Sequence, residues 1–260
     1  MNAFVHPLMN GYFTNLEARF RALGVAAPVY ITANNGGTVS LETARARPVD
    51  TVLSGPASGV LAATRTAPAQ SSLITFDMGG TSTDVFCLPA GAADRDWERS
   101  AETEIAGLLL TASRLPIHTV AAGGGSIIEP DAGRLLVGPR SAGADPGPVC
   151  YRRGGPLTIT DAHLLLGRLQ AGAFPAVFGP ARDQRPDLEA TRAGFHRLAA
   201  ELGQTPEQLA EGALDLAVDA MAAAIRQVSL FRGHDIRGGV LIAYGGAAGQ
   251  LACRLAEALG

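Results

Sequence analysis

The sequence predicts an α/β fold, and three regions carry that prediction. Residues 73–88 (LITFDMGGTSTDVFCL) contain two β-prone runs joined by a short polar turn, which is typical of a hairpin. Residues 188–202 and 206–231 have the apolar spacing of long helices. Residues 240–259 form a strand, a glycine turn and a final helix beginning near Gln250. Strands that alternate with helices in this way indicate α/β architecture.

Weaker elements precede the hairpin. Residues 12–23 repeat apolar side chains at helical spacing, and residues 29–32 predict a short strand. An extended stretch is expected at 49–53. Ser54 is the expected N-cap of a helix that ends near Thr64, because a serine hydroxyl can accept a hydrogen bond from a free N–H of the first turn.

The middle of the chain has less regular signals. Residues 90–115 favour strands and connections around Trp97. Glycine and proline are too frequent in 138–151 for a helix or a long strand. A short helix is expected at 161–169, and a loop at 171–186.

Composition narrows the class of protein. The 260 residues are 47% hydrophobic with a mean hydropathy of +0.17, which favours a compact globular protein. A net charge of −3 gives no electrostatic case for nucleic acid. All 21 basic residues are arginine, which excludes a lysine phosphate loop and Schiff-base chemistry.

The three cysteines are far apart and form no disulfide framework. The sequence shows neither a signal peptide nor a long apolar run, so a cytoplasmic protein without membrane contact is expected.

The hairpin turn is the main candidate site. Between Asp77 and Asp84 stand Gly79, Gly80, Thr81, Ser82 and Thr83. Glycine lets backbone N–H groups approach an anion, hydroxyls can donate to phosphate oxygens, and Asp77 can hold Mg²⁺ through water. The alternative is an ordinary tight turn, but three hydroxyls between two acids favour a nucleotide-phosphate loop.

Two further glycine turns accompany it, Gly123-Gly124-Gly125 and Gly245-Gly246. Each alone is more often structural. The last lies between a strand and a helix, where α/β folds commonly bind ligands. Together with the hairpin, the two turns are predicted to hold a nucleotide from two sides.

A second site is less strongly indicated. Cys150 lies near Asp145, Asp161 and His163 in the sequence, and such side chains can bind Zn²⁺ or Mn²⁺. The alternative is a half-buried thiol beside an acid that caps a helix.

Many segments resemble one family, that of hydantoinase A, 5-oxoprolinase and the acetone carboxylase β subunit. The matching segments occur in order along essentially the whole chain and include Asn2-Ala3-Phe4-Val5, Ser54-Gly55-Pro56-Ala57, residues 76–85, residues 122–127, residues 137–148, Cys150-Tyr151, Thr160-Asp161-Ala162 and residues 245–249. The resemblance implies the actin-like ATPase fold (ribonuclease H-like), with a mixed sheet and flanking helices.

The resemblance also implies an ATP-dependent and Mg²⁺-dependent reaction on a cyclic amide or a ketone. Residues 77–81 would form the second phosphate-binding hairpin, with catalytic roles for Asp77 and Asp84, and Gly245-Gly246 the adenosine-side turn. Phosphorylation of a carbonyl or amide oxygen would create a leaving group. The enzyme would then be a cyclic amidohydrolase of the hydantoin or 5-oxoproline type.

The chain also departs from the family pattern. The family's first Asp-x-Gly-Gly-Thr hairpin is missing, so the chain corresponds to a partial core without its first lobe. Residues 1–70 would be an inter-lobe segment and the start of the core, and 71–260 the nucleotide-binding core. Leu251 stands where the family commonly has histidine. The expected partners are the missing lobe and a hydantoinase B-type subunit, and the chain alone is expected to be inactive.

Two alternatives stay open from the sequence. One is the β subunit of an ATP-dependent ketone carboxylase, which shares the same motifs. The other is a non-catalytic module in which nucleotide hydrolysis drives a conformational change.

Overall fold

The computed structural model describes residues 2–68, 71–91, 100–105 and 108–260. They form two compact units, one of Met1–Gln70 with Ala90–Ile117 and one of Ser71–Pro89 with His118–Gly260. The sequence-based division also separates the chain near residue 70, but it keeps 90–117 with the core. Trp97 lies outside the described residues.

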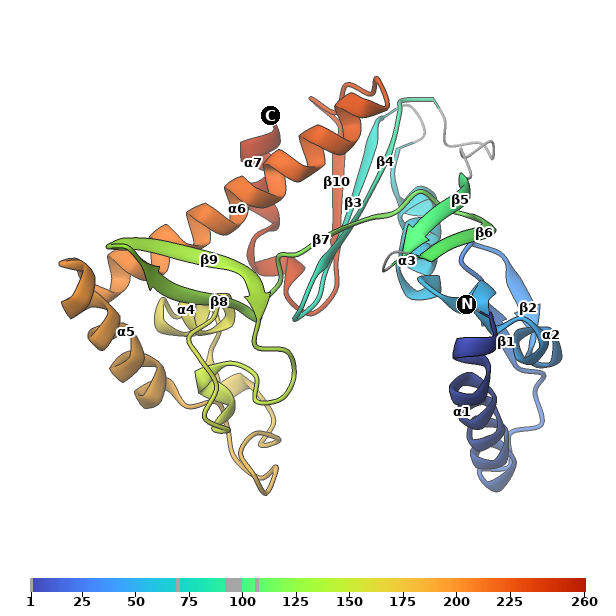
Figure 1. Ribbon diagram of the computed structural model, residues 1–260, viewed down its shortest axis with the longest axis horizontal. Helices are drawn as coiled ribbons and strands as arrows, with labels where there is room; N and C mark the ends of the chain where they lie inside the picture. Colours follow the sequence, from blue (N-terminus) through green and yellow to red (C-terminus); the bar gives the residue numbers. More distant parts are fainter. Residues whose placement is uncertain (1, 69–70, 92–99, 106–107) are drawn as a thin grey trace. The chain divides into compact units, whose positions relative to one another are not determined.

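The first unit contains short elements besides its N-terminal helix (Figure 1). They are α1 (Asn2–Ala22), β1 (Tyr30–Thr32), β2 (Thr38–Ser40), α2 (Leu41–Ala46), a 3₁₀ turn (Pro48–Thr51), α3 (Ser54–Thr66), β5 (Ser100–Ile105) and β6 (Leu108–Arg114). β1 pairs antiparallel with β2, and β5 pairs antiparallel with β6. The first helix, the strand at 29–32 and the helix after residue 53 agree with the sequence-based prediction.

Two predictions for this unit are wrong in detail. Residues 49–53 are not extended, because Pro48 begins a 3₁₀ turn, where its fixed φ angle suits the first position. The N-cap of α3 is Leu53, at φ 63°, and not Ser54, which is already the first helical residue. The hydroxyl of Ser58 donates back to the Ser54 carbonyl at 2.8 Å inside the helix.

A four-stranded mixed sheet organises the second unit (Figure 1). Its strands are β3 (Leu73–Met78), β4 (Thr83–Leu88), β7 (His118–Val120) and β10 (Val240–Tyr244), in the order β10-β3-β4-β7. β10 runs parallel to β3, whereas the β3–β4 and β4–β7 pairs are antiparallel. The hairpin and the terminal strand expected from the sequence are therefore both present.

This sheet is covered by α6 (Pro206–Phe231) and α7 (Ala252–Leu259). The helices α4 (Ile159–Leu165) and α5 (Leu188–Leu202) pack in turn against α6. Alternate side chains of β3 and β4, among them Phe76 and Val85, share a buried cluster with Met221 and Ile225 of α6. Full burial of one such side chain contributes about 2 kcal/mol. The two long helices have the predicted bounds, and Thr205 with Gln208 forms the predicted capping box of α6.

A second hairpin was not predicted from the sequence. It consists of β8 (Ser126–Asp131) and β9 (Arg134–Ser141), which packs against α6. Ala132 and Gly133 turn between them with φ angles of 48° and 78°. β9 tolerates Gly138 and Pro139 because it is an edge strand, where a missing N–H costs no ladder bond.

α4 begins earlier than expected from the sequence. Thr158 is its N-cap and Asp161 its third residue, so the acid faces back onto the cap in a capping box. Among the described residues, no helix is both long and apolar enough to cross a bilayer.

Candidate active site

Four polar residues form a row across the sheet. In the strand register Tyr244 is opposite Asp77, Asp77 is opposite Asp84, and Asp84 is opposite Thr119. The preceding residue of β4, Thr83, is fully buried and reaches Met221 of α6 on the other face. Because side chains alternate along a strand, Asp84 and its row lie on the face away from α6.

The two carboxylates at the centre of the row repel each other. Like charges placed directly opposite in a sheet are destabilising. Burial, followed by the neighbouring charge of Asp84, raises the pKa of Asp77 above its usual range. Within the described part of the chain, neither Asp77 nor Asp84 forms an ion pair. This face of the sheet is therefore suited to a cation.

The end residues of the row respond to the same charge. The Thr119 hydroxyl donates to Oδ1 of Asp84 at 2.6 Å. Burial raises the pKa of Tyr244 to about 12, and the nearby carboxylates of Asp77 and Asp84 contribute to that increase. Tyr244 thus keeps its proton beside the acidic pair.

The hairpin turn leaves several donors free. Gly79 closes it by donating its N–H to the Ser82 carbonyl at 3.0 Å. Gly80 and Thr81 are exposed, and Ser82 is half-buried. Among the described residues, the backbone N–H groups of Gly80, Thr81 and Ser82 and the two hydroxyls have no hydrogen-bond partner. Successive free N–H groups of this kind can hold an anion.

The second glycine turn lies directly against the first. Gly124 donates its N–H to the Gly79 carbonyl at 3.0 Å, and Gly125 donates to the Gly80 carbonyl at 2.6 Å. The Gly123 N–H is bonded to Oγ of Ser126 at 2.9 Å. All three N–H groups of this turn are therefore hydrogen-bonded inside the protein. Their contribution is to support the hairpin turn from behind.

This supporting turn is built from glycine because its backbone lies very close to the backbone of the hairpin turn. A Cβ atom at Gly123 would lie 2.6 Å from the Gly80 carbonyl oxygen, and one at Gly125 would lie 2.8 Å from it. Real Cβ atoms do not come so close to backbone atoms. A side chain at either position would push the turn out of place.

The third turn reaches the same place from β10. Gly245 has a φ angle of +93°, and a Cβ atom there would collide with Oδ1 of Asp77 and stand 2.6 Å from the Met78 carbonyl oxygen. Ala247 donates its N–H to that carbonyl at 2.9 Å. Gly246 is exposed and has no atom within 4 Å of its Cβ position. The structure thus brings the three glycine turns together at one end of the sheet.

The second predicted site is not formed as a metal centre. Among the described residues, no group of three His, Cys, Asp or Glu side chains is placed to hold a metal ion. Asp145 is exposed, whereas Cys150, Asp161 and His163 are buried. Asp161 and His163 are two positions apart on α4, so they point to different faces of the helix.

Asp161 has a structural role instead. Its carboxylate accepts backbone N–H bonds from Val149 at 3.2 Å, Cys150 at 2.9 Å and Thr158 at 2.9 Å. The hydroxyls of Thr158 and Thr191 donate to it at 2.9 and 3.3 Å. One buried carboxylate therefore joins the 3₁₀ turn Val149–Tyr151, the start of α4 and helix α5. Burial raises the pKa of Asp161, and these donors oppose that increase.

His163 makes stability depend on pH. The side chain is fully buried, and neither ring nitrogen has a hydrogen-bond partner among the described residues. Burial first, then the charges of Arg168 and Arg254, lower its pKa from 6.5 to about 4. As the pH falls below 6.5, the unfolded chain binds the proton first. The free energy of unfolding is therefore expected to decrease between pH 6.5 and 4, by up to roughly 3 kcal/mol.

The measurement is urea unfolding of the wild type and the His163→Leu variant at several pH values. The variant lacks the titrating group, so its stability relative to wild type should rise as the pH falls from 7 to 4. If the two stability curves run parallel over that interval, His163 does not titrate as inferred.

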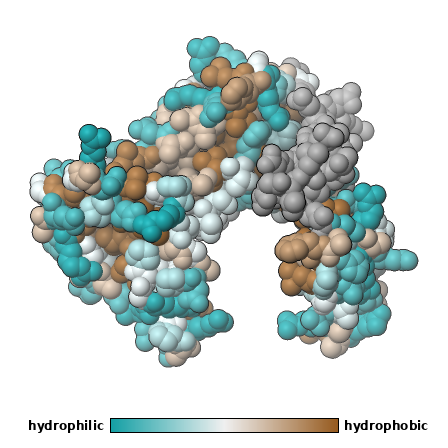
Figure 2. Space-filling model, in the orientation of Figure 1, coloured by the Kyte–Doolittle hydropathy of each residue, from teal (hydrophilic) through white to brown (hydrophobic). Residues whose placement is uncertain are grey.

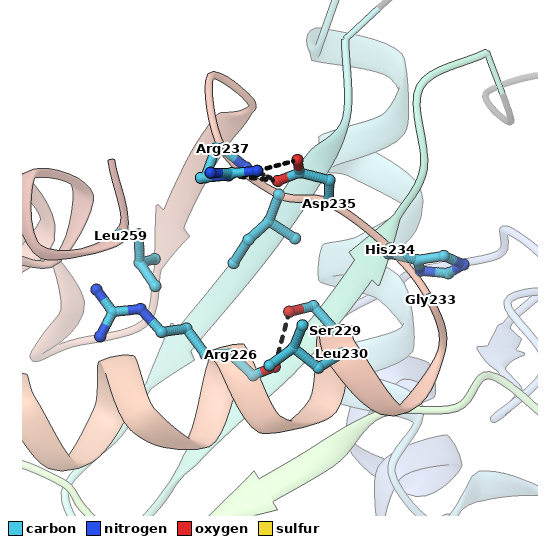
Figure 3. Close-up of a pocket in the computed structure, with 9 residues that line it drawn as sticks. Arg226, Ser229, Leu230, Gly233, His234, Asp235, Arg237 and Leu259 are labelled. Atoms are coloured by element: carbon cyan, nitrogen blue, oxygen red, sulfur yellow. Dashed lines mark hydrogen bonds and ion pairs between the residues drawn. The ribbon is translucent and has the colours of Figure 1, made fainter.

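One surface cavity of the second unit lies away from the hairpin turn and its two acids. Figure 2 shows a hydrophobic patch over the C-terminal end of α6, where Leu230 and Phe231 are 75% and 83% exposed. Beside it, a cavity of about 470 Å³ is lined by residues of α6, by Leu259 and by the loop before β10 (Figure 3). Within that loop Arg237 pairs with Asp235 at 2.8 Å. The glycine turns follow the other end of β10, so this cavity is separate from them.

No sequence motif indicated the two end residues of the row, Thr119 and Tyr244. Thr119 lies in a three-residue strand that no periodicity distinguishes, and Tyr244 is predicted only as part of β10. Only the register of four strands shows that they flank the two acids. Leu251, at the position where the resemblance implies a histidine in other family members, is fully buried in the core.

Several known proteins are similar to this chain in sequence or in structure. A 5-oxoprolinase of Dictyostelium discoideum is 39% identical over 285 residues, a match that covers all of this chain and 22% of that protein. The ATP-dependent caprolactamase from Pseudomonas jessenii has a crystal structure with a TM-score of 0.75 at 37% identity, covering all of this chain and 37% of that one. A nucleotide-free acetone carboxylase structure has a TM-score of 0.79 at 27% identity, covering 95% of this chain and 34% of that one.

The fold is therefore the mixed α/β fold of hydantoinase and actin-like ATPase type, as the sequence predicts. All 260 residues match the hydantoinase/oxoprolinase family model, and the chain belongs to that family. The chain spans only about a fifth to two-fifths of the length of these relatives.

Proposed function

We propose that the chain is the nucleotide-binding core of an enzyme that opens a cyclic amide of the hydantoin or 5-oxoproline type at the expense of ATP. The main observation is the exposed turn Gly80–Ser82, whose free N–H groups and hydroxyls stand next to two facing carboxylates. The relatives named for ATP-dependent caprolactam and 5-oxoproline hydrolysis support the same assignment.

The donor set fits Mg²⁺. Asp77 and Asp84 supply hard oxygen ligands, directly or through water, and their mutual repulsion would be relieved by a cation between them and the phosphates. When bound, Mg²⁺ neutralises phosphate charge during phosphoryl transfer. A transition metal has no comparable donor set among the described residues.

The residues of this chain would act mainly by positioning. The free N–H groups of Gly80, Thr81 and Ser82 and the hydroxyls would hold phosphate oxygens in place. Gly123, Gly124 and Gly125 would keep that turn rigid, and Gly246 would leave open backbone for the adenosine side. Transfer of the terminal phosphoryl group to the amide carbonyl oxygen, with ADP leaving, would make the carbon open to attack by water. Expulsion of the protonated ring nitrogen from that adduct would break the C–N bond and leave an acyl phosphate. A second water would hydrolyse the acyl phosphate to the carboxylate and phosphate.

The remaining parts of the active site would be supplied by polypeptide outside these 260 residues. The relatives are several times longer, and the caprolactamase relative is named as an alpha subunit. We therefore include a first lobe carrying another phosphate hairpin and a hydantoinase B-type subunit among the proposed partners.

The ketone carboxylase β subunit remains the second candidate. Its support is the acetone carboxylase structure, whose identity of 27% is lower than the 37% of the caprolactamase. A purely nucleotide-gated module has no observation of its own in its favour. Product analysis with hydantoins, 5-oxoproline, and acetone plus bicarbonate separates the two enzymatic functions.

The test of nucleotide binding is Asp77→Ala in the complete polypeptide that contains this chain. Loss of the carboxylate is expected to weaken binding of a non-hydrolysable ATP analogue with Mg²⁺ and to lower substrate-stimulated ATP hydrolysis by about 10²-fold or more. Calorimetry and a phosphate-release assay measure the two effects. Asp131→Ala, which removes an exposed acid from the β8–β9 hairpin, is the control. Unchanged affinity and turnover in Asp77→Ala would contradict the proposal.

A further inference from the structure

Thr119 is held in place against Asp84 by the sheet. The two residues are direct partners in the β4–β7 register, and the Thr119 hydroxyl donates to Oδ1 of Asp84 at 2.6 Å. A length of 2.5–2.7 Å is typical of an O–H donor bonded to a charged carboxylate.

A hydrogen bond on the opposite face of β4 fixes the same register between β4 and β7. Thr83, next to Asp84, is fully buried, and its hydroxyl donates to the Ala122 carbonyl at 2.6 Å. Ala122 lies two residues after the end of β7 and leads into the glycine turn that supports the hairpin. β7 is thus bonded to β4 on both sides, so the position of Thr119 does not depend on a mobile side chain alone.

The Asp84 carboxylate requires a partner that fixes its orientation. It faces Asp77 across the β3–β4 pair, and two like charges in this arrangement favour rotation of one carboxylate away from the other. The hydroxyl of Thr119 engages Oδ1 and leaves Oδ2 without a partner among the described residues. Asp84 is in this way kept in the row, with one oxygen left available.

We propose that Thr119 is a positioning residue that orients the Asp84 carboxylate toward a hydrated divalent cation on a bound nucleotide. This inference rests on the proposed function, because it needs Mg²⁺-nucleotide at the hairpin turn. It assigns a role to a residue in a strand that carries none of the phosphate-binding motifs.

The experiment compares Thr119→Val, Thr119→Ser and the control Thr66→Val in the complete polypeptide. Thr66 is an exposed threonine of α3 whose hydroxyl bonds only to the Ala62 carbonyl of its own helix. ADP binding is titrated without and with increasing Mg²⁺. Mn²⁺ bound with ADP is followed by electron paramagnetic resonance.

Thr119→Val is expected to raise the Mg²⁺ concentration for half-maximal effect about 10-fold, which corresponds to loss of one hydrogen bond to a charged group. Its ADP affinity without divalent cation should stay within about two-fold of wild type, since the free N–H groups of the turn are untouched. The Mn²⁺ spectrum should change. Thr119→Ser keeps the hydroxyl and should restore wild-type behaviour, and Thr66→Val should show it throughout.

The outcomes separate the two proposals. If the wild type binds ADP with Mg²⁺ and Asp77→Ala does not, but Thr119→Val keeps the wild-type Mg²⁺ dependence, only the role of Thr119 is overturned. A uniform loss in Thr119→Val, equal with and without Mg²⁺ and not restored by serine, indicates a structural role and also overturns it. If the wild type shows no Mg²⁺-dependent nucleotide binding, the proposed function itself fails, and the inference with it.

Discussion

Replacing Gly245 by alanine is expected to lower the free energy of unfolding by roughly 3–5 kcal/mol and to abolish nucleotide binding. The φ angle of +93° costs an L-residue conformational energy. The added methyl group would also collide with Asp77 and stand 2.6 Å from the Met78 carbonyl oxygen. Relief of both contacts would move the end of β3, and with it the hairpin turn.

The adjacent glycine provides a matched control. Gly246 is exposed and has nothing within 4 Å of its Cβ position, so Gly246→Ala should change the stability by less than about 0.5 kcal/mol. Urea unfolding of both variants, followed by circular dichroism, gives the comparison. If the two variants have equal stabilities, the protein can accommodate a methyl group at residue 245 without loss of free energy of unfolding, and the prediction is wrong.

Asp161→Ala is expected to have a similarly large effect on stability, about 3–5 kcal/mol. The substitution leaves the buried N–H groups of Cys150 and Thr158 without acceptors and also removes the bond from Thr191. A buried donor without a partner costs about 1–3 kcal/mol. Three segments would lose their common connection at once.

Asp145→Ala is the control for this effect. Asp145 is an exposed acid from the same glycine-rich segment, so its loss should change the stability by no more than about 0.5 kcal/mol. Differential scanning calorimetry of the two variants measures the contrast. A small effect of Asp161→Ala would mean that water replaces the carboxylate, and that the acid does not hold these segments together.

The sequence correctly predicted those helices and strands that depend on residues close together in the chain. The hairpin at 73–88 follows from two β-prone runs and a glycine-containing turn, and α6 follows from its cap and its apolar spacing. The three glycine turns were also predicted as a set, and the structure brings them together. What the sequence could not show is that Gly124 and Gly125 donate to carbonyls of the hairpin turn, since that depends on how two distant turns meet.

Contacts between distant segments account for the other differences. Cys150, Asp161 and His163 are close in sequence, but the helical rotation of α4 separates the last two, and backbone donors occupy Asp161. The partnership of Thr119 with Asp84 depends on strand pairing between segments that have no shared motif. The β8–β9 hairpin was missed because proline and glycine in β9 suggested irregular chain, although an edge strand accepts both.

The parallel pairing of β10 with β3 also bears on how the protein is made. Asp77 is synthesised well before its neighbour Tyr244 and before Gly245, which crowds it. Until then the first half of the sheet has an uncovered edge next to β3, which is open to wrong pairing. Premature termination before Val240 would leave a polypeptide whose acidic pair lacks the neighbouring strand that carries Tyr244. The site can therefore assemble only after β10 has been synthesised, and the open edge of β3 is a route to misfolding until then.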